Sequence, residues 1–245
     1  MASRIVDSLP SRIEQRLDAQ LSLAGRIKTT PAASKKVAPF ITISRQYGCE
    51  AVALAENLIP KLVAIEGLEG EHWEIYGRQI LETMAEHEHL SDRLIEALDV
   101  HTRGGIEEFF DTLIGKSPSD IRVLKHIVRT ERALALIGRC IIIGRGGVLL
   151  TAGLPGGIHV RLVAPEAWRL KELVSRFKWD DHKARQFLHE EENGRHTFFQ
   201  KYLGQDVNDP LHYDLILNTA HLGLEDQAAA ITGLFAERIR AKPRR

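Results

Sequence analysis

The residues best suited to chemistry follow the first strongly apolar run, where Ile43 is succeeded by the segment Ser44–Glu50 (SRQYGCE). A strand that turns at Gly48 and enters a helix leaves several backbone N–H groups unpaired, and the helix dipole favours an anion beside them. Arg45 can add a planar guanidinium that binds a phosphate through two hydrogen bonds. The segment therefore predicts an anion site. The alternative is an ordinary strand-to-helix connection with its arginine in solvent.

Cysteine and histidine offer two further kinds of chemistry. Cys49 lies at the same predicted helix N-terminus, where a lowered thiol pKa would make it reactive. The interpretation that we favour is a small, packed side chain. The 11 histidines lack ligand spacing, since His87 and His89 point to different sides of a helix and His182 and His189 are two turns apart. The sequence predicts no metal site.

Apolar runs that alternate with helical spacing predict the elements that position these residues. The expected strands are 40–43, 141–143, 158–163 and 213–217, with one more near 72–76. The expected helices are about 50–66, 75–98, 105–137, 165–192 and 224–240. This order indicates an α/β fold with a mostly parallel sheet covered by helices on both faces. Pro60 predicts a kink or a break in the first of these helices.

An N-terminal segment, residues 1–38, precedes the α/β domain expected over 39–240. A capping box predicts a short amphipathic helix there, followed by a linker at 29–36. Its apolar stripe consists of Ile13, Leu17, Leu21 and Ala24. We expect the stripe to pack on the chain's own domain, with a homo-oligomer formed through this helix as the alternative. Residues 241–245 are a basic tail.

Composition restricts the partners and the compartment. The chain has 245 residues with 33 basic and 33 acidic side chains, which removes the usual electrostatic argument for nucleic acid or an acidic membrane. There are two cysteines and no run of about 18 apolar residues, so nothing is expected to span a membrane. The first residues lack the apolar core of a signal peptide. A cytoplasmic protein with a small-molecule partner is expected.

Four segments in order resemble the cytidylate kinase-like family, which is related to the nucleoside monophosphate kinases. They are 41–48 (ITISRQYG), 141–146 (IIIGRG), 159–165 (HVRLVAP) with Arg169, and 213–219 (YDLILNT). The likeness covers roughly residues 39–240. It implies a P-loop nucleoside monophosphate kinase-like fold with a helical insertion. It also implies ATP and Mg²⁺, and transfer of a phosphoryl group to a small nucleotide-like acceptor.

The resemblance implies a role for each segment. The donor phosphates would be held by Ser44, Arg45, Gln46, Tyr47, Gly48, Cys49 and Glu50. The insertion 75–137 would bind the acceptor together with Arg145, and the segment of about 178–203 would be a lid. Arg45 and Arg195 would act on the transferring group, since phosphoryl transfer depends on positioning and charge neutralisation. Asp214 and Asn218 of the last motif are assigned to substrate binding.

The sequence departs from the kinase pattern at the phosphate loop. Ala51 occupies the position of the P-loop lysine, and Val52 and Ala53 stand where a hydroxyl would hold Mg²⁺. Glu50 would repel a polyphosphate unless the carboxylate is paired. Further departures are Gly77 and Asn193, where similar sequences carry an aspartate and an arginine. Arg169 and Arg176 lie on one helix face and are expected to be solvated or paired with acids.

Three hypotheses follow from these observations. The first is a phosphotransferase of the cytidylate kinase-like kind. The second is a degenerate relative that binds a nucleotide, or nothing, and acts as a regulator or assembly module. The third, and the least favoured, is an unrelated α/β protein.

Overall fold

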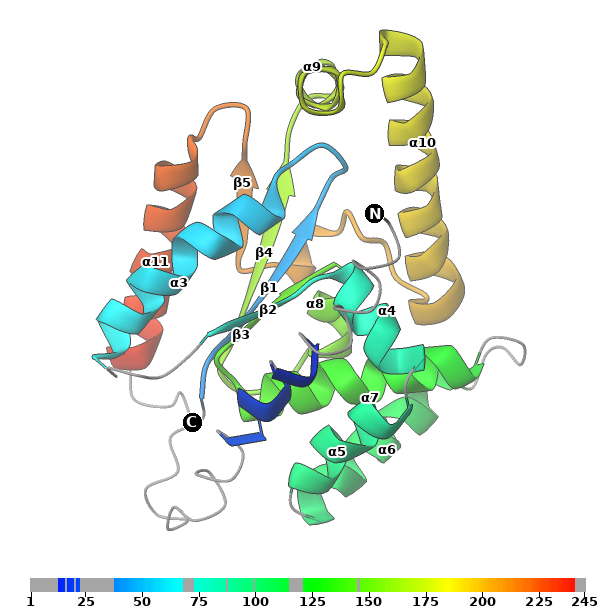
Figure 1. Ribbon diagram of the computed structural model, residues 1–245, viewed down its shortest axis with the longest axis vertical. Helices are drawn as coiled ribbons and strands as arrows, with labels where there is room; N and C mark the ends of the chain where they lie inside the picture. The colour runs from blue at the N-terminus through cyan, green and yellow to red at the C-terminus, as the bar shows by residue number, and fades with distance from the viewer. Residues whose placement is uncertain are drawn as a thin grey trace. The chain divides into compact units, whose positions relative to one another are not determined.

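The computed structural model describes residues 13–15, 17–19, 21–22, 38–67, 73–86, 88–98, 100–114, 121–144 and 146–240 (Figure 1). The chain folds as an α/β protein with five strands in one sheet. The strands are β1 (Phe40–Arg45), β2 (Glu74–Tyr76), β3 (Cys140–Ile143), β4 (Gly157–Val163) and β5 (Leu215–Asn218). Their order in the sheet is β2-β3-β1-β4-β5.

The strands run parallel, as the alternation of strands and helices predicts. Ile75 of β2 is in register with Ile141 of β3, and Val160 of β4 with Leu215 of β5. All four residues of β3 and the first five of β1 are buried, as expected for strands with helices on both sides. The predicted fold class is confirmed, and β2 supplies the additional strand expected near 72–76.

By its internal contacts the chain divides into two compact units. The first unit comprises Met1–Phe40, His72–Arg145 and Leu150–Gly157, and the second comprises Ile41–Glu71, Gly146–Leu149 and Ile158–Arg245. The short helix α8 (Gly147–Leu150) ends at the boundary between them.

In the first unit the helices gather around α7. They are α4 (Arg78–Glu86), α5 (Glu88–Ala97), α6 (Val100–Ile114) and α7 (Ile121–Ile137), and the first three all pack against the last. Ile13 and Leu17 of the N-terminal stripe are at most 1% exposed within the core of this unit, and Leu21 packs against the same core. These three positions therefore pack on the chain's own domain, as expected. Ala24, the linker and the basic tail lie outside the described residues.

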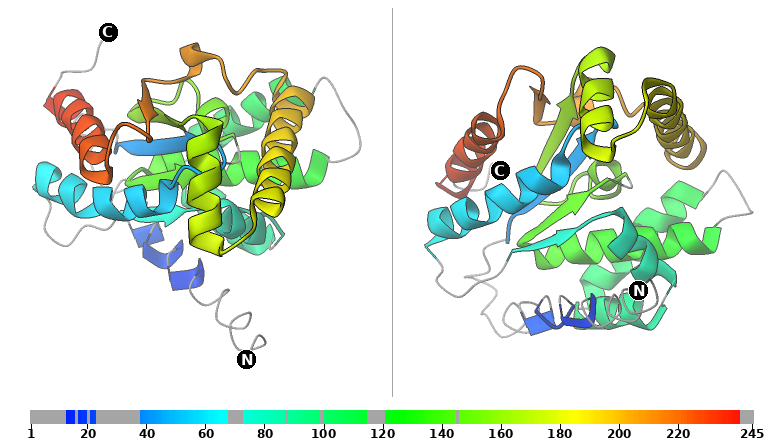
Figure 2. Two further views of the ribbon diagram at one scale, coloured as in Figure 1. Left: turned by 90° about the horizontal axis from the view of Figure 1, so that it is seen from above. Right: turned by 45° about the horizontal axis from the view of Figure 1, so that its top comes forward.

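In the second unit α3 (Ala51–Glu66) packs along α11 (Leu224–Arg240), and the two helices lie side by side in both views (Figures 1 and 2). Glu225 joins them by accepting hydrogen bonds from Asn57 at 2.7 Å and Lys61 at 2.9 Å. Helix α3 runs unbroken through Pro60, so the break that the proline could have caused is absent. Buried Leu54, Leu58 and Leu62 hold the helix on both sides of the proline.

The pattern predicted as one helix over 165–192 forms two helices, α9 (Glu166–Phe177) and α10 (Asp181–Phe198). Lys178 has a φ of 54°, a left-handed conformation that ends α9. The side chain of Asp180 caps α10 by accepting a hydrogen bond from the backbone N–H of Lys183 at 2.8 Å. A π-helical turn, η2 (Phe199–Leu203), and a 3-10 turn, η3 (Pro210–His212), follow α10. The broad patterns 75–98 and 105–137 likewise each resolve into two helices.

The helices of the described ranges include none that is both long enough and apolar enough to cross a lipid bilayer.

Candidate functional site

The loop between β1 and α3 is fixed to β4 by Gln46. The backbone N–H of Gln46 donates to the carbonyl of Leu162 at 2.9 Å, and its side-chain oxygen accepts from the N–H of Ala164 at 2.9 Å. A further bond from the N–H of Cys49 to the carbonyl of Gln46, at 3.2 Å, closes a tight turn. Gln46 therefore positions the loop from the carboxyl end of the sheet, where ligands of parallel α/β proteins bind.

Gly48 is required by two features of this turn. Its φ of 98° is strained for any residue with a side chain. A Cβ atom added to it would lie 2.8 Å from the Cβ of Arg169 and 3.2 Å from its backbone. The loop can therefore approach α9 this closely only because residue 48 is glycine.

The loop presents backbone donors that the protein itself does not use. Within the described chain, no hydrogen bond is donated by the N–H groups of Tyr47, Gly48 or Glu50. Glu50 precedes the first residue of α3 and makes no side-chain cap, so the helix N-terminus adds further donors and the positive end of its dipole. These are the backbone features that the sequence predicted for an anion site.

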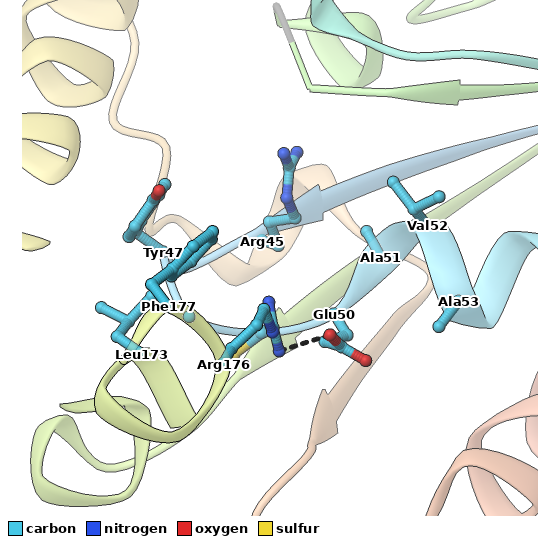
Figure 3. Close-up of a pocket in the computed structure, with 11 residues that line it drawn as sticks. Arg45, Tyr47, Glu50, Ala51, Val52, Ala53, Leu173, Arg176 and Phe177 are labelled. Atoms are coloured by element: carbon cyan, nitrogen blue, oxygen red, sulfur yellow. Dashed lines mark ion pairs between the residues drawn. The ribbon is translucent and has the colours of Figure 1, made fainter. Parts of the chain in front are cut away.

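A pocket of about 170 Å³ opens beside the loop (Figure 3). Loop residues, the first turn of α3 and the C-terminal turn of α9 enclose it. Its lining includes Arg45, Glu50, Val52, Arg176 and Phe177. Every lining residue belongs to the second unit.

Glu50 is paired inside this pocket. Its Oε1 lies 2.5 Å from Nη2 of Arg176, with the two side chains 49% and 33% exposed (Figure 3). The pair compensates part of the charge of the carboxylate, which reduces the repulsion between Glu50 and a polyphosphate. It also places a carboxylate against a guanidinium that a bound anion would otherwise contact. Arg176 is thus paired with an acid, as expected.

Arg169 on α9 connects three parts of the second unit. It is 4% exposed, its Nε donates to the carbonyl of Ala164 at 3.0 Å, and its Nη1 donates to the carbonyl of Tyr47 at 3.1 Å. The same Nη1 lies 2.6 Å from Oε1 of Glu192 on α10. Of the two expectations for Arg169, pairing with an acid is confirmed. The other expectation, that Arg169 is solvated, is wrong, because the loop and α10 cover its side chain.

Arg195 brings α10 to the same loop. Its Nη1 donates a short hydrogen bond to the backbone carbonyl of Arg45. Burial, together with the positive charges of Arg45 and Arg161, lowers the pKa of Arg195 to about 10. The structure therefore brings together the two residues predicted to act on the transferring group.

Arg161 is a neighbour of this site that the sequence reasoning left without a role. It lies on β4, is 3% exposed, and donates to Oγ of Ser44 at 3.0 Å. The sequence does mark Arg161 as unusual, because it is a charged residue inside the apolar run 158–163. Its position in that run predicts a strand but does not predict which side chains it contacts.

Cys49 is packed rather than reactive. It is 4% exposed, and burial raises the pKa of its thiol, opposite to the shift that a nucleophilic thiol needs. The hydroxyl of Thr219 donates to its Sγ at 3.4 Å. The favoured interpretation of a small buried side chain agrees with this environment.

The structure does not bring Asp214 and Asn218 to the pocket. Asp214 precedes β5, at the amino end of the strand, where it accepts from the N–H of His159 at 2.7 Å and pairs with Arg238. Asn218 ends β5, and its side-chain oxygen accepts from the N–H of Ala220 at 3.0 Å. Both contacts hold the fold, so the substrate role remains a prediction. Arg145 lies outside the described residues.

The five-stranded parallel sheet and the helices that pack on it define an α/β fold. The chain belongs to the cytidylate kinase-like family, whose model matches residues 40–221.

Two solved structures extend this comparison. An uncharacterized protein from Eubacterium ventriosum aligns with a TM-score of 0.58 at 16% identity, over 82% of this chain and 99% of that one. The protein TT1252 from Thermus thermophilus aligns with a TM-score of 0.38 at 16% identity, over 82% and 98% of the two chains. The first of these likenesses supports the fold alone. The curated proteins include no match to this chain.

Proposed function

We propose that this protein is a nucleoside monophosphate kinase-like phosphotransferase that moves a phosphoryl group from ATP to a small nucleotide-like acceptor. The observation that carries the proposal is the convergence of guanidinium groups on a loop with unused backbone donors. The arginines come from β1, β4, α9 and α10, and they are Arg45, Arg161, Arg169, Arg176 and Arg195.

The charge balance around the loop favours an anion. The carboxylates that face these arginines are Glu50, Glu191 and Glu192, so five guanidinium groups meet three carboxylates. The excess of two positive charges is local, because the chain as a whole has a net charge of zero. Local positive charge of this kind is what phosphoryl transfer needs, since the protein contributes mainly positioning and electrostatic stabilisation.

The roles divide between the loop and α10. The N–H groups of the loop and the side chain of Arg45 would hold the donor phosphates. Arg195 reaches the loop from α10, a helix inside the segment predicted as the lid, and would neutralise charge on the transferring group.

The described residues do not fit a magnesium ion held by the protein. Val52 and Ala53 supply no hydroxyl, and the carboxylate in the pocket, Glu50, is paired with Arg176. Among the described residues no group of three or more His, Cys, Asp or Glu side chains could hold a metal ion. Magnesium would therefore arrive as part of an ATP–magnesium substrate, bound through its phosphates.

A second candidate is a degenerate relative that binds a nucleotide without turnover and acts as a regulator. The observation that favours it is the Glu50–Arg176 ion pair together with Ala51 at the lysine position, because both reduce the positive charge available to the phosphates. The two candidates share the anion site and differ in chemistry.

A panel of nucleoside monophosphates separates the candidates. ADP release is measured with purified protein and ATP–magnesium, beside calorimetric binding of ATP. Release above background with one acceptor, lost in Arg195→Met, supports the phosphotransferase. Binding of ATP with background release across the panel supports the degenerate regulator. Absence of both activities contradicts both candidates.

A further inference from the structure

Arg161 differs from the other buried arginine of the site in the nature of its partners. Its Nη2 donates to the side-chain oxygen of Asn208 at 2.7 Å, and its Nη1 donates to Oγ of Ser44 at 3.0 Å. The same Nη1 lies 3.3 Å from the hydroxyl of Tyr213, whose ring centroid is 5.4 Å from the guanidinium carbon. All of these partners are neutral. Across the described chain no carboxylate forms an ion pair with Arg161.

A guanidinium that is 3% exposed and lacks a counter-charge is costly, because a buried charge normally requires an opposite charge or a metal. Arg169, which is buried to a similar degree, has the carboxylate of Glu192 at 2.6 Å. Arg161 instead lies close enough to Arg195 for its positive charge to lower the pKa of that arginine. The uncompensated charge of Arg161 therefore lies near the carboxyl end of the sheet, next to Ser44 of β1.

The hydrogen bonds around Ser44 determine where its proton points. Oγ of Ser44 accepts from Arg161, so this contact does not use the serine proton. The hydroxyl of Tyr213 has one proton, which its shorter bond to the carbonyl of Val207, at 2.8 Å rather than 3.3 Å to Ser44, takes up. The proton of Ser44 then has one acceptor among the described residues, the oxygen of Tyr213, and this hydrogen bond is long, at 3.3 Å, so a bound ligand can replace it. Ser44 is thus a weakly engaged O–H donor near the carboxyl end of β1.

We propose that Arg161 is a positioning residue of the donor site: it fixes Ser44 so that the serine hydroxyl donates to the loop-bound polyphosphate, and its buried charge attracts that polyphosphate. The inference rests on the proposed function, because it places the phosphates of the donor nucleotide at this loop. Asn208 and Tyr213 hold the guanidinium, and Ser44 transmits its position to the ligand.

In a purely structural role Arg161 would join β4 to Ser44, Asn208 and Tyr213 without affecting anion affinity. The matched control for this role is Arg132 on α7, which is also a buried arginine, at 8% exposed, with neutral partners. Its Nη1 donates to the carbonyl of Leu150 at 2.8 Å, and its guanidinium lies 3.8 Å from the ring centroid of Phe109. Arg132 belongs to the first unit and does not line the pocket.

The test is calorimetric titration of the full chain with inorganic tripolyphosphate, which isolates the phosphate contacts from those of a base. We expect Arg161→Met to weaken tripolyphosphate binding by about tenfold or more, as for loss of a charged hydrogen-bonding partner. Arg161→Lys keeps the charge but not the fork of donors, and should weaken binding by less. Arg132→Met should lower the melting temperature and leave the tripolyphosphate affinity unchanged.

The route through Ser44 is tested by a double-mutant cycle. Ser44→Ala should weaken binding in the wild-type background by about threefold or more, and should have little further effect in Arg161→Met. Equal effects in both backgrounds would overturn the positioning role. If Arg161→Met does not fold, the test rests on Ser44→Ala and Arg161→Lys. An unchanged tripolyphosphate affinity in both variants overturns the inference.

Two further outcomes separate this inference from the function on which it rests. If Arg45→Ala abolishes tripolyphosphate binding while Arg161→Met binds as the wild type does, the inference fails and the donor site stands. If the wild-type chain binds neither tripolyphosphate nor ATP, the proposed function fails and the inference fails with it.

Discussion

Replacing Glu50 with glutamine should strengthen polyphosphate binding. Glu50→Gln removes one negative charge, keeps the volume of the side chain, and releases Arg176 from the ion pair at 2.5 Å. The half-exposed pair itself is worth little, about 0.2 to 1 kcal/mol. The larger contribution comes from the charge that the carboxylate places beside the ligand.

The size of this contribution follows from Coulomb's law. For one phosphate charge about 6 Å from the carboxylate, the repulsion is about 0.7 kcal/mol in bulk water and about 2.8 kcal/mol at the effective dielectric constant of a protein surface. Glu50→Gln should therefore bind tripolyphosphate roughly 3- to 100-fold more tightly than the wild type. The gain should shrink as salt is added, because both side chains are partly exposed.

The assay is calorimetric titration with tripolyphosphate at low and at high salt. Glu166→Gln is the control. Glu166 is the first residue of α9 and forms a comparable ion pair, lying 2.9 Å from Arg185 of α10, but it does not line the pocket. The control should bind as the wild type does. Unchanged or weaker binding by Glu50→Gln would refute the reasoning, since it would mean that phosphate does not bind near Glu50 and Arg176.

Three further predictions test the loop, its turn and the N-terminal stripe. Arg45→Ala should weaken ATP binding by about 1.5 to 3 kcal/mol, measured by calorimetry, and an unchanged affinity would remove Arg45 from the site. Gly48→Ala should lower the free energy of unfolding by about 1 to 3 kcal/mol in urea titration, because residue 48 has a φ of 98° and contacts Arg169; a neutral effect would contradict that geometry. Leu17→Ala should cost about 2 to 5 kcal/mol in the same titration without changing the mass in light scattering, since Leu17 is 0% exposed within its own unit; a mass change would favour a homo-oligomer.

The periodicity of the sequence predicted the sheet and its helices well, and the reason is visible in the strands. β1 and β3 are buried almost throughout, so their apolar runs carry a strong signal. The break between α9 and α10 was missed, because it depends on the left-handed backbone of Lys178 and on the cap formed by Asp180. Hydrophobic spacing continues across that break and does not report either feature.

The site was predictable only in part. The loop and its glycine could be predicted from the transition between strand and helix. The role of Arg195 was implied by the resemblance to a family. The pairing of Glu50 with Arg176 and the contacts of Arg161 join residues that are far apart in the chain. Such contacts depend on the packing of α9 and β4 around the loop, and a single sequence carries no direct signal of them.

The contacts of Arg169 have an energetic consequence for α10. Lifting α10 away from the loop separates Glu192 from a guanidinium that is 4% exposed and remains bound to the carbonyls of Tyr47 and Ala164. Stripping one partner from a buried ion pair costs about 3 to 5 kcal/mol. At the upper end of that range an opened helix would be present in fewer than about one molecule in a thousand. The resting form of this unit is therefore one in which α10 already lies against the loop.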